Sequence, residues 1–236
     1  AACPACGAGH SRPCNNHDAD CCRATVRRLS MKSRSQSRSW PHDLSLQRVL
    51  VVGSCGAGKS TFARALAPRL GRPVVELDAF HWGPDWTPKP REAFRALAAA
   101  AAAREGWIAD GNYSAVRDLL WPRAQTVFWL NYPFHTVMVR ALRRTLRRSL
   151  GRQTLWHGNR ETLAMAVGRD GVPREVWRTW ARRRRLLAEL RAGNAYPHLT
   201  WIEFHAPAQA QAFVDALDGL RAEHAQADQF DTGCPR

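Results

Sequence analysis

From about residue 46 onward, short apolar runs alternate with longer segments in which apolar residues recur every three or four positions. The short runs are rich in β-branched and aromatic residues, as buried strands are, and the three-to-four spacing is typical of amphipathic helices. Five strands are predicted, at 48–52, 73–77, 107–110, 126–130 and 199–204. Helices are predicted at 61–70, 91–104, 134–150, 175–191 and 207–220, with a loop at 78–88 and a short helix that Ser114 caps and that ends near Trp121.

Strands that alternate with helices in this way predict an α/β fold, with a five-stranded parallel sheet flanked by helices on both faces. In such sheets a ligand binds at the carboxyl ends of the strands. The first four predicted strands end at Gly53, Asp78, Asp110 and Asn131. We therefore expect these four residues at one edge of the sheet.

The predicted helix 134–150 is strongly amphipathic. Its apolar face is predicted to comprise Phe134, Met138, Ala141, Leu142 and Leu146. The opposite face carries Arg140, Arg143, Arg144, Arg147 and Arg148 at three- and four-residue spacing. Most of these arginines are expected to be solvated, and one or two are candidates for binding a phosphate.

Residues 1–45 differ in composition from the rest, because they contain few apolar residues and many serines, arginines and cysteines. Cys3-x-x-Cys6 is compatible with the start of a zinc site, but no second Cys-x-x-Cys follows. The favoured interpretation is a disordered extension, native or not, followed by a folded domain at 46–222 and a frayed tail at 223–236. No apolar run is long enough for a membrane span and no secretory signal is visible, so a cytoplasmic protein is expected.

The formal net charge is +15, and much of it is local. Residues 140–191 contain fifteen arginines and four acidic residues, which gives this region a net charge of +11. Such a region can bind nucleic acid non-specifically through its phosphates. Heavy use of arginine and alanine with only three lysines also has a second explanation, the base composition of the genome.

The pattern G-x-x-x-x-G-K-[ST] is matched by Gly53-Ser54-Cys55-Gly56-Ala57-Gly58-Lys59-Ser60-Thr61. It stands between a predicted strand and a predicted helix, which is the context that a phosphate-binding loop requires and a chance match lacks. Backbone N–H groups of the loop and the helix N-terminus would hold the phosphates of ATP. Lys59 would reach the β- and γ-phosphates, and the Ser60 hydroxyl would bind Mg²⁺.

The chain resembles the adenylate-kinase-like P-loop kinases, and more narrowly the small kinases described as DNA topology modulation proteins. The resemblance spans about 48–220 and rests on the loop 53–61, Leu77-Asp78 with His81-Trp82, the segment 107–113, and Gly158-Asn159-Arg160-Glu161. It implies a P-loop NTPase fold of the nucleoside-monophosphate-kinase type, with a donor site at the P-loop and a short arginine-rich lid. The sequence departs from adenylate kinases where Asn112-Tyr113 replaces the Phe-Pro-Arg that binds the acceptor phosphate there.

The resemblance also implies roles for individual residues. Asp110 would act near the Mg²⁺, through its water shell, and the acceptor would contact Asp78, His81, Trp82, Asn112 and Tyr113. Candidate catalytic residues are Lys59, Asp110, Arg140, Arg144 and Arg160. Simpler interpretations stay open: Asp78 as a turn cap, His81 as a hydrogen-bonded loop residue, and Trp82 with Trp86 as a cover over the core.

Two functions follow from these observations. The first is a monomeric kinase that transfers the γ-phosphoryl group of ATP, with Mg²⁺, to a small acceptor such as a nucleoside or nucleotide. The second is a nucleotide-dependent protein that binds nucleic acid through residues 140–191 and affects DNA topology. The first is preferred, because the basic charge has a compositional explanation and the P-loop has none.

Overall fold

The computed structural model describes residues 44–150, 156–159 and 171–218. The predicted extension at 1–45 lies outside these residues apart from its last two positions. The predicted tail at 223–236, the cysteine pattern near Cys3 and the candidate residue Arg160 also lie outside them. Their predicted roles stay predictions.

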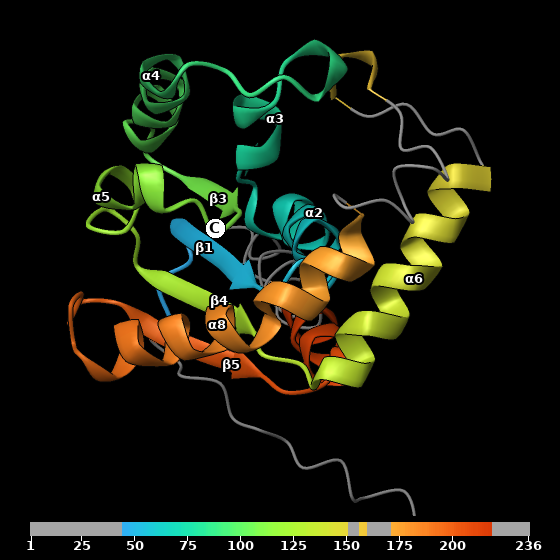
Figure 1. Ribbon diagram of the computed structural model, residues 1–236. Helices are drawn as coiled ribbons and strands as arrows, with labels where there is room; N and C mark the ends of the chain where they lie inside the picture. The colour runs from blue at the N-terminus through green and yellow to red at the C-terminus, as the bar shows by residue number, and fades with distance from the viewer. Residues whose placement is uncertain (1–43, 151–155, 160–170, 219–236) are drawn as a thin grey trace, which may run out of the picture. The chain divides into compact units, whose positions relative to one another are not determined.

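Five strands form one sheet in which every neighbouring pair is parallel, as the sequence predicts (Figure 1). The strands are β1 (Arg48–Gly53), β2 (Val74–Glu76), β3 (Trp107–Asp110), β4 (Thr126–Leu130) and β5 (Thr200–Phe204). Their order is β2-β3-β1-β4-β5, so β1 lies in the middle. The P-loop that follows β1 therefore has a strand end on each side.

Helices connect the strands. They are α2 (Lys59–Leu70), α3 (Leu77–His81), α4 (Arg91–Ala102), α5 (Arg117–Leu120), α6 (Phe134–Leu150) and α8 (Val172–Ala192), and residues 207–218 are also helical. Short 3-10 turns occur at η1 (Pro84–Trp86), η2 (Ser114–Val116) and η3 (Trp156–Gly158). No described helix is long and apolar enough to cross a membrane.

Both faces of the sheet are covered, because alternate residues of each strand point to opposite sides. Residues such as Leu50, Val52 and Trp129 pack with apolar residues of α4, α5 and α8 in one cluster. On the other face, rings of the strands meet rings of α2 and of the helix 207–218. These rings are Phe62, Phe128, Phe204 and Phe213, with centroids 4.9–6.5 Å apart.

The segment after β2 differs from the prediction. The strand ends at Glu76, and Leu77–His81 forms the helix α3 where the sequence predicts the end of a strand and the start of a loop. The buried Leu77 anchors the first turn of this helix. Ser114 is also placed wrongly as a cap, because the 3-10 turn begins at Ser114 and has Tyr113 at its cap position without a side-chain cap.

Helix α6 has its predicted bounds, and its predicted apolar face is right at the buried Ala141 and wrong at Leu142 and Leu146. Leu142 and Leu146 are 50% and 55% exposed, whereas Val137, Ala141 and Thr145 form the buried stripe. The reason is close contact with the P-loop. A Cβ placed on Gly56 would lie 2.9 Å from the Cβ of Ala141, so only a small residue fits at the contact.

Candidate functional site

The P-loop runs from the end of β1 into α2, and its backbone geometry depends on glycine. Gly58 occupies the N-cap of α2 with φ 97°, in the left-handed region that other residues rarely adopt. Without a side chain here, the N-terminus of α2 and its free N–H groups stay open to an anion. Cys55, in the middle of the loop, is a half-buried free thiol.

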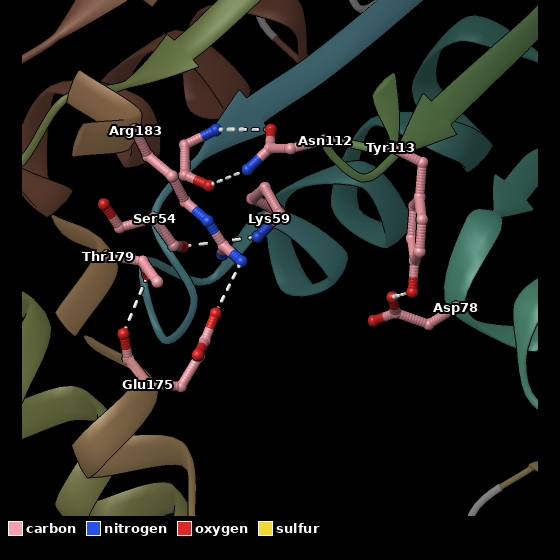
Figure 2. Close-up of polar contacts among 9 residues, drawn as sticks. Ser54, Lys59, Asp78, Asn112, Tyr113, Glu175, Thr179 and Arg183 are labelled. Atoms are coloured by element: carbon pink, nitrogen blue, oxygen red, sulfur yellow. Dashed lines mark hydrogen bonds and ion pairs between the residues drawn. The ribbon is translucent and has the colours of Figure 1, made fainter. Parts of the chain in front are cut away.

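Lys59 lies at the first position of α2, where its ammonium folds back onto the loop. Its Nζ donates to the carbonyl oxygen of Ser54 at 3.3 Å (Figure 2). This long hydrogen bond leaves further N–H donors on the ammonium group. Lys59 is therefore placed at the loop that it would serve when phosphates bind.

Asp110 and Ser60 form a hydrogen-bonded pair beside the P-loop. Asp110 closes β3 and is 5% exposed. Burial raises the pKa of its carboxyl, while the charge of Lys59 and the hydrogen bond from Ser60 oppose that rise. A carboxylate and a hydroxyl next to a phosphate site are hard oxygen donors, which fit Mg²⁺ held directly and through water.

Asn112 fastens the P-loop to the end of β3. Its side-chain amide donates to the carbonyl oxygen of Gly53 at 2.5 Å, and its Oδ1 accepts from the Gly53 N–H at 3.2 Å (Figure 2). The sequence predicts Asn112 as an acceptor-binding residue. Both polar atoms of this amide form hydrogen bonds to the P-loop. The geometry of Asn112 therefore does not support a contact with the acceptor.

Arg140 lies directly against the P-loop. A Cβ on Gly58 would come within 2.6 Å of its guanidinium, so the absence of a side chain at Gly58 makes room for it. Arg140 and Arg144 follow one another by one turn of α6 and are half-buried. The Nε atoms of both arginines are buried without a hydrogen-bond partner in the described part of the chain.

Such buried donors cost free energy unless a ligand satisfies them, because each has lost its water. Their place beside an anion-binding loop makes phosphate oxygens the natural partners. The sequence predicts these two of the five arginines on the helix as catalytic residues. In the structure, Arg140 lies at the P-loop.

Arg183 of α8 is a further basic residue at the site, which the sequence analysis does not single out. Figure 2 shows its side chain reaching from α8 toward the P-loop, with its guanidinium held by Glu175 at 2.8 Å. Its charge acts on Tyr113, whose pKa it lowers against a larger upward effect of burial. Arg183 is half-buried, whereas the other three arginines of the run 182–185 are exposed. From the sequence, only the position of Arg183 around the helix axis could have distinguished it from them.

Across from these arginines, Asp78 and Tyr113 form a second polar group. The Tyr113 hydroxyl donates to Asp78 Oδ1 at 2.5 Å (Figure 2). Burial and the nearby Asp78 carboxylate both raise the pKa of Tyr113, so its hydroxyl stays protonated and donating. Asp78 reaches this place from the first turn of α3, on the β2 side of the sheet.

Aromatic rings surround this polar group. His81 contacts the rings of Trp82, Tyr113 and Phe94 at centroid distances of 4.7, 4.9 and 5.4 Å. Its Nδ1 is buried and lacks a hydrogen-bond partner among the described residues. The structure therefore brings together Asp78, His81, Trp82 and Tyr113, four of the five residues predicted to contact the acceptor.

Residues 156–159, which follow α6 in the chain, bind to the segment around α3 and η1. The Trp156 indole N–H donates to Glu76 at 2.7 Å. Asn159, which is 5% exposed, donates to the carbonyl oxygen of Gly83 at 2.8 Å and accepts from the Trp86 N–H at 3.3 Å. Residues 156–159 are thereby fixed to the aromatic side of the site.

A cavity of about 290 Å³ adjoins the P-loop on the side of α6 and the helix 207–218. Thr61, Tyr132, Arg140 and Gln211 supply polar groups to it, and apolar residues line the rest. Burial raises the pKa of Tyr132 to about 12, so this residue is a neutral hydroxyl at physiological pH. A hollow of about 640 Å³ over α4 and α5 contains no P-loop residue.

No family model and no curated protein matches the chain. Among solved structures, it is similar to shikimate kinase from Acinetobacter baumannii, with 20% identity over 77% of this chain and 96% of that one and a TM-score of 0.43. A gluconokinase from Sinorhizobium meliloti gives 20% identity, 79% and 97% coverage, and a TM-score of 0.43. Shikimate kinase from Aquifex aeolicus gives 14%, 74% and 98%, and 0.42. These similarities are low, and the residues of this chain carry the functional interpretation.

Proposed function

We propose that this protein is an ATP-dependent phosphotransferase that moves the γ-phosphoryl group of ATP to a hydroxyl group of a small molecule. One observation carries the proposal. Basic groups gather on the α6 and α8 side of the P-loop, and a separate carboxylate with aromatic neighbours lies on the β2 and β3 side. A site with a cationic half and an acidic half suits two substrates, a polyphosphate donor and a hydroxyl acceptor.

In the donor half, the P-loop N–H groups and Lys59 would hold the β- and γ-phosphates. Arg140, Arg144 and Arg183 would complete their hydrogen bonding on phosphate oxygens and stabilise the charge that spreads over them during transfer. Mg²⁺, held by Ser60 and through water by Asp110, would neutralise charge on the β- and γ-oxygens when bound. The nucleoside of ATP would occupy the cavity of about 290 Å³.

In the acceptor half, Asp78 would orient the attacking hydroxyl. One of its carboxylate oxygens accepts from Tyr113, and the other is available to accept from the substrate. Positioning of this kind contributes most of the catalysis in phosphoryl transfer, since the protein forms no covalent bond to the phosphoryl group.

The Lys59→Ala variant tests the proposal. Removing the ammonium is expected to lower ATP turnover by about 10²-fold or more while the far-UV circular dichroism spectrum stays unchanged. ADP formation would be followed with ATP, Mg²⁺ and a panel of hydroxyl compounds. Full turnover in the variant, or a wild-type protein that binds ATP and phosphorylates nothing in the panel, would contradict the proposal.

Nucleic-acid binding in the cytoplasm is the second candidate, and exposed arginines favour it. Arg143 and Arg147 of α6 and Arg182 and Arg185 of α8 are exposed, and these two helices pack together. If they bind phosphate backbones, DNA affinity falls steeply as salt rises and survives Lys59→Ala. This candidate is wrong if the DNA affinity does not change with salt concentration. It is also wrong if a change in the oligomeric state of the protein explains the measured salt dependence.

A further inference from the structure

Three carboxylates gather where β2 and β3 end. Glu76 closes β2 and pairs in register with Asp110, which closes β3. Asp78 lies two residues beyond Glu76, in the first turn of α3. The three carboxylates therefore lie at the same end of two neighbouring strands.

Two of these carboxylates have charged or multiple partners. Glu76 forms an ion pair with Arg64 at 2.6 Å and accepts from the Trp156 indole at 2.7 Å. Asp110 has the hydrogen bond from Ser60 and the charge of Lys59. Both carboxylates therefore have partners within the protein.

Asp78 differs from them. Its partner is the neutral hydroxyl of Tyr113, and in the described part of the chain no basic side chain forms an ion pair with it. Among the described residues this carboxylate has no charged partner, so it would repel a phosphate or carboxylate brought to the same place.

Three basic residues of the site have their contacts at the P-loop or on α8. Arg140 lies against Gly58, Lys59 donates to Ser54, and Arg183 is held by Glu175. On the Asp78 side the neighbours are rings, since His81 joins Trp82, Tyr113 and Phe94, and Trp82 contacts Trp86 at 5.9 Å. Aromatic faces bind flat bases and the apolar faces of sugar rings, without any requirement for charge.

We propose that the acceptor is an uncharged ring compound with a free hydroxyl, a nucleoside or a sugar, and that analogues with a phosphate or carboxylate near that hydroxyl are rejected by Asp78. The inference rests on the proposed phosphotransferase function. The acceptor oxygen forms a bond to the γ-phosphorus, and the bond from that phosphorus to the β,γ-bridging oxygen breaks. ADP leaves, and the hydroxyl proton passes to the Asp78 carboxylate and then to solvent.

The experiment compares pairs that keep the ring and the primary or neighbouring hydroxyl groups, with the full-length protein, ATP and Mg²⁺: adenosine with 3′-AMP, cytidine with 3′-CMP, and glucose with glucuronate. The uncharged member of at least one pair is expected to give kcat/KM at least about tenfold above its anionic partner. Comparison of the nucleoside pairs with the sugar pairs shows which of these two classes of compound is the acceptor. If the anionic members are preferred, the neutral class is wrong and the phosphotransferase stands. If ATP binds and no compound is phosphorylated, the proposed function itself fails.

A second measurement identifies Asp78 as the origin of the discrimination. Asp78→Asn is expected to reduce the preference for the uncharged member by about tenfold or more, while ATP affinity measured by titration stays unchanged. Glu105→Gln, at an exposed carboxyl, is the matched control and should keep the wild-type preference. An unaltered preference in Asp78→Asn would overturn the role of Asp78. If that variant does not fold, the wild-type pairs still decide the substrate class.

Discussion

At the scale of single residues, the site contains polar side chains that do not use all of their hydrogen-bonding capacity within the described part of the chain. The buried Nε atoms of Arg140 and Arg144 and the carboxylate of Asp78 each have unused hydrogen-bonding capacity. The cost of leaving such groups unsatisfied is about 1–3 kcal/mol for each, so they persist where a ligand makes use of them. Asp110 has partners in Ser60 and Lys59, but the effect of burial on its charge is larger.

Replacement of Asp110 by Asn should stabilise the ligand-free protein at neutral pH. Burial raises the pKa of Asp110 above its ordinary value of 3.8, so the folded state binds this proton more tightly than the unfolded chain. The stability that this proton provides is present in full below pH 3.8 and is lost as pH rises through the folded pKa. Asp110→Asn should therefore have a higher Tm than wild type at pH 7, with a difference that shrinks toward pH 4.

Asp118→Asn provides a control of opposite sign. The Arg95 guanidinium lowers the pKa of Asp118, so this carboxylate stabilises the fold above its ordinary pKa and loses that effect as pH falls. Thermal melts of both variants from pH 4 to 8 make the comparison. A lower Tm of Asp110→Asn at pH 7 without ligand would contradict the expected sign.

At the scale of elements, α6 shows how contact geometry decides which face of a helix is buried. The helix has to approach the P-loop backbone at Gly56, and the small side chain of Ala141 permits that approach. Leucine at 142 and 146 then points outward despite its hydrophobicity. The spacing of apolar residues alone predicts a face that includes Ala141 and also these two exposed leucines.

Two substitutions separate these alternatives. Leu142→Ala should change the free energy of unfolding by less than about 0.5 kcal/mol, because the side chain is half exposed. Ala141→Leu should destabilise by about 1–3 kcal/mol and weaken ATP binding, because the larger side chain collides with Gly56. Chemical denaturation and ATP titration provide the measurements. If Leu142→Ala cost more than Ala141→Leu, the orientation of α6 would be wrong.

The short stretch 156–159 gives a further prediction at this scale. Asn159 holds Gly83 and the Trp86 N–H, in a turn where Asp85 and Trp86 have positive φ of 52° and 56°. Such backbone costs about 1–3 kcal/mol per residue and needs support. In Asn159→Ala, hydrogen exchange at residues 83–87 should accelerate by about tenfold or more.

The control for this prediction is Asn194→Ala. Asn194 also has positive φ, at 48°, but it is exposed and lies just after α8. Its substitution should leave exchange at residues 83–87 unchanged. Equal protection of these amides in wild type and Asn159→Ala would show that the two hydrogen bonds do not fix the turn.

A structural feature can be predicted from the sequence when the residues that form it are close together in the chain. The P-loop and the strands 107–110 and 126–130 are encoded in consecutive residues, and they appear at the predicted positions. The role of Asn112 as a clamp on Gly53 and the reach of Arg183 depend on segments 59 or more residues apart. Such contacts follow from the packing of α8 and β3 around β1, which no local pattern of residues specifies.

At the scale of the whole molecule, the strand order places the proposed donor and acceptor residues on opposite sides of β1. The middle strand β1 carries the P-loop, with β3 and β2 on one side and β4 and β5 on the other. The proposed acceptor residues come from the first side, through α3 and the turn after β3. The proposed donor arginines come from the helices that follow β4.

This division has a consequence for the order in which substrates bind. Since donor and acceptor residues belong to opposite flanks of β1, neither substrate has to arrive first to complete the pocket of the other. Initial-rate plots against ATP at several acceptor concentrations should therefore give intersecting lines, with ADP competitive against ATP alone. Parallel lines would indicate a covalent phosphoryl-enzyme and contradict direct transfer, and a compulsory first substrate in isotope-exchange measurements would show that one flank needs the other to be filled.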